Sequence, residues 1–115
     1  MIDHAALRTA LLEVHKTLLE VERREHEKHH GRLTPHAFLD TLLHDPAFAW
    51  LQPLTTLIVA LDEADLTLEE GTVAELRFML GAADHPNDFQ ERYAAALQRS
   101  PELAYAHGVL MRALG

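Results

Sequence analysis

Three times in this chain of 115 residues, an oxygen-bearing side chain is followed directly by proline. The pairs are Thr34-Pro35, Asp45-Pro46 and Ser100-Pro101. A helix begins readily at such a pair, because the first side chain accepts a hydrogen bond from a free backbone N–H and proline has no N–H to leave unpaired. Asn87 is a further candidate cap. Long alternations of apolar and polar residues, which are typical of strands, are absent from the sequence. These signals predict an all-α protein.

The spacing of apolar residues supports the same prediction. Between residues 3 and 30 they recur in steps of three and four, which makes a narrow seam along one helix (Leu7, Leu11, Val14, Leu18 and Val21). We expect further helices over 35–44, 46–64, 68–82, 88–99 and 101–114, with a kink or a break at Pro53. The connections between them are short, which favours antiparallel neighbours. The prediction is a single domain over residues 1–115, a compact bundle of four main helices with one or two short ones, mostly antiparallel.

Composition allows such a domain a core of its own. Apolar residues make up 48% of the chain, and cysteine is absent. A chain of this size can fold without disulfides or a structural metal, and thiolate metal sites and cysteine nucleophiles are excluded. The expected core residues are Leu7, Leu11, Leu18, Phe38, Leu42, Phe48, Trp50, Leu57, Ile58, Leu61, Leu76, Leu80, Phe89, Tyr93 and Leu110.

The net charge of −8 is concentrated in the middle of the chain. Residues 33–76 contain eight acidic side chains and no Lys or Arg, whereas the two flanking parts are balanced. This charge argues against nucleic acid and against an anionic membrane surface as partners. It suits either a docking patch for a basic partner or a solvated face that keeps the domain soluble. The first ten residues lack an apolar signal core, and apolar runs such as 57–61 are at most five residues long, so we expect a cytoplasmic protein.

Nine histidines in the chain raise the question of a metal site. Helical geometry places Glu22, His26, His29 and His30 on one face of the first helix, and His36 follows after a tight connection. Imidazoles one helical turn apart can share a divalent ion, so His26, His30 and His36, completed by Glu22 or His29, are the predicted ligands for zinc or nickel. The competing interpretation is a solvated helix end held by ion pairs such as that of Glu20 with Arg24.

The same segment contains the pattern H-E-x-x-H from His26 to His30, which is typical of zinc peptidases with the glutamate as general base. In this chain that glutamate is Glu27, and His36 lies at the distance of a third ligand. However, Leu33 occupies the position where the longer motif requires glycine, and the preceding residues are charged rather than apolar. A metal hydrolase is therefore the third hypothesis, and no catalytic residue is assigned.

A resemblance rests on the stretch Leu43-His44-Asp45-Pro46-Ala47-Phe48-Ala49-Trp50-Leu51-Gln52-Pro53-Leu54, with Leu18-Leu19-Glu20 and Glu27-x-x-x-Gly31-Arg32 before it. These motifs resemble small uncharacterised helical proteins of bacteria. The resemblance covers about half of the chain and implies a helical domain, but it carries over no catalytic or binding residue.

The leading functional prediction is a non-enzymatic interaction or regulatory domain that forms a homodimer or binds a protein partner. Its contact surface would be either the polar end of the first helix or the acidic middle of the chain. Zinc or nickel binding through the histidine cluster is the alternative, and no other cofactor is expected.

Overall fold

The computed structural model describes residues 3–63, 70–81 and 84–115, and these residues form six α-helices and a 3-10 helix without a strand among them. The helices are α1 (His4–His30), α2 (Pro35–His44), α3 (Gln52–Glu63), α4 (Glu70–Leu80), α5 (Asp88–Arg99) and α6 (Pro101–Leu114), and the 3-10 helix η1 (Pro46–Leu51) lies between α2 and α3. The predicted all-α bundle is confirmed.

Local capping explains where these helices begin. The hydroxyl of Thr34 accepts a hydrogen bond from the backbone N–H of Ala37, and Ser100 accepts from Leu103 in the same way, both at 3.1 Å. Asn87 forms a reciprocal capping box with Gln90. The segment before Pro53 differs from an ordinary α-helix, since Pro46 begins η1 and α3 starts only at Gln52. The expected break at this proline is therefore present.

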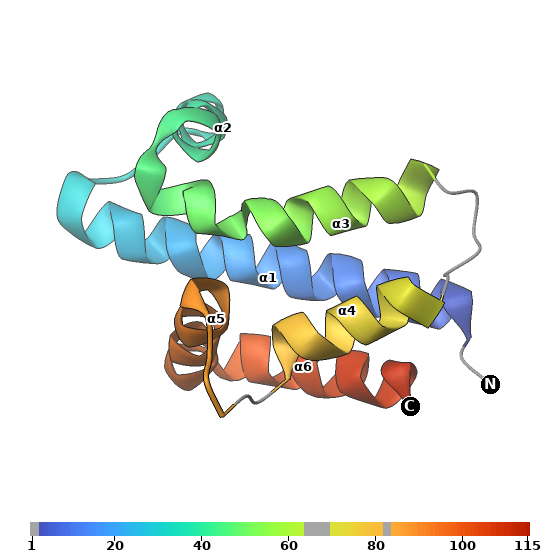
Figure 1. The fold of residues 1–115 in the computed structure, drawn as a ribbon. Coiled ribbons are helices and arrows are strands. Elements are labelled where there is room, and N and C mark those ends of the chain that lie inside the picture. The colour runs from blue at the N-terminus through green and yellow to red at the C-terminus, as the bar shows by residue number, and fades with distance from the viewer. Residues whose placement is uncertain (1–2, 64–69, 82–83) are drawn as a thin grey trace.

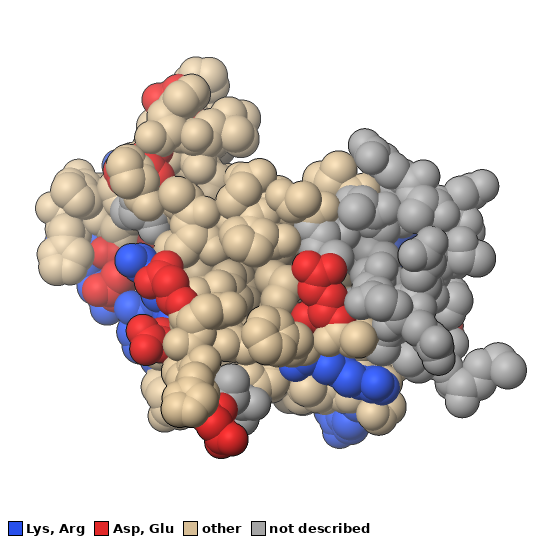
Figure 2. Space-filling view, viewed as in Figure 1, with Lys and Arg blue, Asp and Glu red and all other residues tan. Residues whose placement is uncertain are grey.

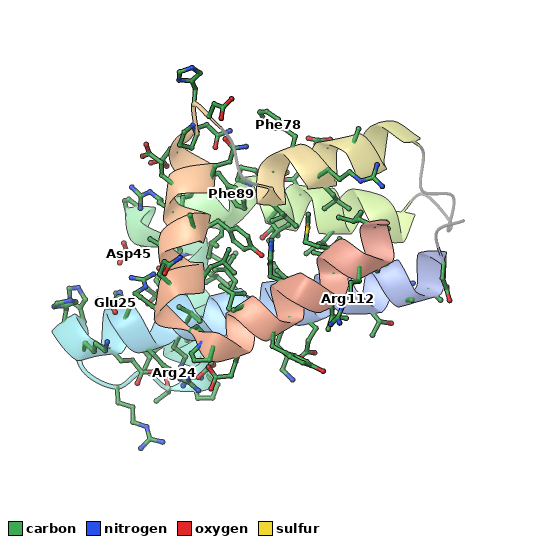
Figure 3. All side chains as sticks on the ribbon, turned by 90° about the horizontal axis from the view of Figure 1, so that it is seen from below. Arg24, Glu25, Asp45, Phe78, Phe89 and Arg112 are labelled. Carbon is green, nitrogen blue, oxygen red and sulfur yellow. The ribbon has the colours of Figure 1, made fainter. Side chains whose placement is uncertain are left out.

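The helices are arranged around α1, the longest of them (Figure 1). α1, α3, α4 and α6 follow one common direction, whereas α5 crosses it in both ribbon views (Figures 1 and 3). α1 and α6 pack along each other and run in opposite directions, so that the end of α1 lies beside the start of α6. α2 stands away from the rest of the bundle and packs on η1.

The core is built from the seam of α1 and from aromatic side chains. Leu7, Leu11, Val14 and Leu18 are buried, as predicted. The rings of Trp50, Phe89, Tyr93 and His107 follow one another at centroid distances of 5.5 to 5.9 Å. The other expected core residues that are buried are Phe48, Ile58, Leu76, Leu80 and Leu110. Phe38 and Leu42 pack against this core but are only partly buried, and the side chains of Leu57 and Leu61 lie outside the described part.

The part of the bundle least covered by its neighbours is α2. It has no fully buried residue, and Leu39 and Leu43 are 53% and 69% exposed. Figure 2 shows uncharged side chains over η1 and the first part of α3, acidic atoms on α2, and acidic and basic side chains gathered near the end of α1. Among the described residues, no helix has the length and apolar character that crossing a membrane requires.

Candidate functional site

The histidine end of α1 places two of the predicted metal ligands together. The rings of His26 and His30 are stacked, with centroids 4.4 Å apart, because the two residues are one helical turn apart. His26 also contacts the ring of Phe48, at a centroid distance of 5.5 Å. His26 is therefore half-buried against the aromatic core, whereas His30 is exposed to solvent.

The other two predicted ligands are placed differently. Glu22 accepts a hydrogen bond of 3.0 Å from the Arg99 guanidinium, which ties α1 to α5, and His36 is exposed on α2. In the described part of the chain, no three histidine or carboxylate side chains converge on a point that could hold a metal ion. The structure thus brings His26 and His30 together without Glu22 or His36, and metal binding by the pair stays a prediction.

Arg23 organises the polar end of α1. Its guanidinium donates to Glu27 at 2.8 Å and to the carbonyl of Leu33 at 2.9 Å, and it lies 5.2 Å from the centre of the Phe38 ring. Glu27, the general base of the hydrolase hypothesis, is therefore engaged in an ion pair. The predicted pair of Glu20 with Arg24 is also present, at 3.7 Å. Arg23 thus fastens α1 to the segment that begins α2, whereas the ion pairs join residues within α1.

The acidic middle of the chain was the other predicted contact surface. The side chains of Asp62, Glu63, Asp65, Glu69 and Glu70 lie outside the described part. Two further acidic residues, Asp40 and Glu75, are exposed on α2 and α4. The prediction of a basic partner at this surface is therefore neither supported nor contradicted by the described residues.

A buried polar pair lies between α5 and α6. The Tyr93 hydroxyl is 2.8 Å from Nδ1 of His107, and the tyrosine is 2% exposed. Burial raises the pKa of Tyr93 and lowers the pKa of His107. The phenol therefore keeps its proton and the imidazole is neutral. The Tyr93 hydroxyl donates a hydrogen bond to Nδ1 of His107 in the tautomer that carries the ring proton on Nε2. The pair satisfies two polar groups inside the bundle.

A groove with a volume of about 950 Å³ lies between α1 and α6. We call this hollow the α1/α6 groove. Small residues dominate the α1 side, which consists of Ala5, Ala6, Thr9, Ala10, Glu13 and Thr17. The α6 side consists of Pro101, Glu102, Tyr105, Ala106 and Val109. Glu13, Thr17 and Glu102 also line the next hollow along α1, which places the two carboxylates at the same end of the groove.

Two exposed apolar side chains of the α1/α6 groove were not identified from the sequence. Tyr105 is 74% exposed, and Val109 is also exposed. The helix buries the opposite face instead, through Leu103, Ala106, Leu110 and Leu114. The spacing of the buried set, in steps of three and four, is the signal that could have separated the two faces.

The fold and the groove define the class of protein: a helical bundle with an open apolar groove between its longest helix and its last. Comparison with models of known protein families, with curated proteins and with solved structures gives no match.

Proposed function

We propose that this protein is a non-enzymatic protein-interaction domain and that the α1/α6 groove is its binding surface. The observation that carries the proposal is the 74% exposure of Tyr105 at the edge of an apolar groove of about 950 Å³. Tyrosine is enriched at protein–protein interfaces, where its ring gains contact area and its hydroxyl remains hydrogen-bonded.

The chemistry of the groove supports a helix as the bound element. Ala5, Ala6 and Ala10 present little side-chain volume, so the backbone of a partner helix can come close to α1. An amphipathic helix that docks in this way buries an apolar face made of residues three and four positions apart. Glu13 and Glu102 at one end of the groove favour a basic side chain on the docked helix.

Site-specific photo-crosslinking in cells that express the full chain tests this proposal. We expect a benzophenone amino acid at position 105 to give discrete adducts, and the same probe at position 78 to give none. Phe78 is the matched control, because it is an aromatic residue that is 63% exposed on α4, outside the groove.

A second variant shows whether the adducts depend on the groove itself. Thr9 is exposed and lines the groove, so Thr9→Trp fills the hollow without disturbing the core and should abolish the adducts. The control substitution Gln98→Trp, on the exposed surface of α5, should leave them unchanged. Adducts that survive Thr9→Trp, or that form equally at position 78, would contradict the proposal.

A further inference from the structure

The exposed face of α6 has an ordered pattern of its own. Glu102, Tyr105, Val109 and Arg112 follow one another in steps of three, four and three, which places them in one stripe along the helix. All four are exposed, and the first three line the α1/α6 groove. The stripe has the spacing of a helix–helix packing seam, yet no other described part of the chain covers it.

The two ends of this stripe carry opposite charges. The pKa of Glu102 is lowered by hydrogen bonds from its own backbone N–H and from the Ser100 hydroxyl, so the carboxylate is charged at neutral pH. Arg112, near the other end of α6 (Figure 3), has no ion-pair partner among the described residues. The stripe is therefore acidic at the start of α6, apolar in the middle and basic at the end.

We infer that the occupant of the α1/α6 groove is α6 of a second copy of this chain, packed antiparallel to α6 of the first. A two-fold axis at the level of residue 107 pairs Glu102 with Arg112 of the second copy, and Tyr105 with Val109 of the second copy. Both pairs recur on the other side of the axis, as a two-fold interface requires. The same stripe is thus complementary to itself in charge and in apolar character.

The α1 side of the groove fits this arrangement. Since α6 runs antiparallel to α1, α6 of the second copy runs parallel to α1 when it lies in the groove. Its Arg112 then approaches the end of the groove that Glu13 and Glu102 line, beside a hollow that Lys16 and Arg24 also line. Glu13 has no ion-pair partner among the described residues, so it is available to a cation from the second copy. The small residues of α1 leave room for Tyr105 of the second copy.

This inference rests on the proposed function and adds the identity of the partner. Sedimentation velocity of the full chain, from low micromolar to submillimolar concentration, measures its self-association directly. We expect the mass to rise with concentration from 13.0 kDa to twice that value. Tyr105→Glu should weaken self-association about tenfold or more, because it buries a charge in the apolar centre of the seam. Phe78→Glu, the matched change outside the groove, should leave self-association unchanged.

A charge swap tests the antiparallel register. Arg112→Glu and Glu102→Arg should each weaken the dimer about tenfold or more, because each places like charges opposite one another. An equimolar mixture of the two variants should form a heterodimer in which both ends are again complementary. Because Glu102 also lies in the first turn of α6, thermal melts at low concentration establish that each variant is folded.

Three outcomes would overturn the inference: a chain that stays monomeric at every concentration, a dimer that survives Tyr105→Glu, or a dimer that dissociates on Phe78→Glu. A monomeric chain that still forms groove-dependent photo-adducts with another protein would retain the proposed function and lose only this partner. A chain that neither self-associates nor forms such adducts would remove both.

Discussion

The hydrogen bond between Tyr93 and His107 depends on pH, because His107 can be protonated. His107 accepts from the tyrosine only while its Nδ1 carries no proton, and burial favours that neutral state by lowering the pKa of the imidazole. His15, which is 3.1 Å from the Thr55 hydroxyl between α1 and α3, has its pKa lowered for the same reason. Both histidines are thus poised to resist protonation in the folded state.

We predict that the protein loses stability as the pH falls below about 6.5, the ordinary pKa of histidine. In the unfolded chain, His15 and His107 bind protons at a higher pH than they do in the folded protein. The stability that the two neutral imidazoles contribute is therefore present above their pKa in the unfolded chain, and it is lost as the pH falls through their lower pKa in the folded state. Urea unfolding at about pH 7.5 and pH 5.5 measures this difference. His107→Gln should reduce the loss, whereas His85→Gln, an exposed control, should not.

Glu22 and Arg99 form an ion pair in which burial and charge act against each other. The Glu22 side chain is 14% exposed and that of Arg99 is 43% exposed. Burial raises the pKa of Glu22, and this effect outweighs the opposing attraction of Arg99. Burying the charged Glu22 carboxylate therefore costs free energy, and the attraction of Arg99 offsets that free energy only in part.

The two partners should consequently respond differently to mutation. Glu22→Gln keeps an acceptor for Arg99 and removes the buried charge, so we expect the free energy of unfolding at pH 7 to change by less than about 0.5 kcal/mol. Arg99→Ala leaves the carboxylate without its cation and should cost about 1–3 kcal/mol. Chemical denaturation of the two variants compares them, and equal losses would contradict this account.

At the scale of elements, the position of α2 depends on a few contacts. The helix has no fully buried residue, and its start is held by Arg23, which donates to the Leu33 carbonyl and lies over the Phe38 ring. A helix attached in this way can open without unfolding the rest of the bundle.

We predict that Arg23→Ala loosens α2 and lowers the free energy of unfolding by about 1–2 kcal/mol, because it removes a charge-assisted hydrogen bond and a cation–π contact. Amide hydrogen exchange should become faster in residues 35–44 and stay unchanged in α5 and α6. Arg24→Ala is the matched control: its side chain is 65% exposed and its ion pair with Glu20 is long, so it should cost less than about 0.5 kcal/mol.

The histidine pair of α1 offers a direct test of the metal hypothesis. If His26 and His30 bind zinc or nickel, stoichiometric metal should raise the melting temperature, because a ligand that binds only the folded state stabilises it. The double substitution His26→Ala with His30→Ala should abolish the rise, and His85→Ala should not. An unchanged melt of the parent protein would end the hypothesis.

At the scale of the whole molecule, stability depends on the seam of α1 that the other helices cover. Leu18 is fully buried, whereas Leu12 is 41% exposed on the same helix. We predict that Leu18→Ala lowers the free energy of unfolding by about 2–5 kcal/mol, since it opens a cavity in the core. Leu12→Ala should cost less than about 1 kcal/mol. Urea denaturation measures both, and similar values would contradict the assigned core.

Elements whose signals act over a few residues could be predicted from the sequence. The starts of α2 and α6 follow from Thr34-Pro35 and Ser100-Pro101, because a cap accepts a hydrogen bond from a backbone group only three residues away. The buried seam of α1 follows from the helical period, and the break before α3 follows from Pro53. The all-α class was determined by these local effects together.

Only the tertiary structure decided which apolar faces are covered. The helical period marks Leu39, Leu43 and Tyr105 as apolar positions, but it does not say whether another helix lies over them, and all three are exposed. Likewise, the spacing within the helix placed Glu22 beside His26, whereas the Glu22 carboxylate accepts a hydrogen bond from Arg99, 77 residues further along the chain. Such contacts depend on how whole helices pack, and periodicity within one helix contains no information about its neighbours.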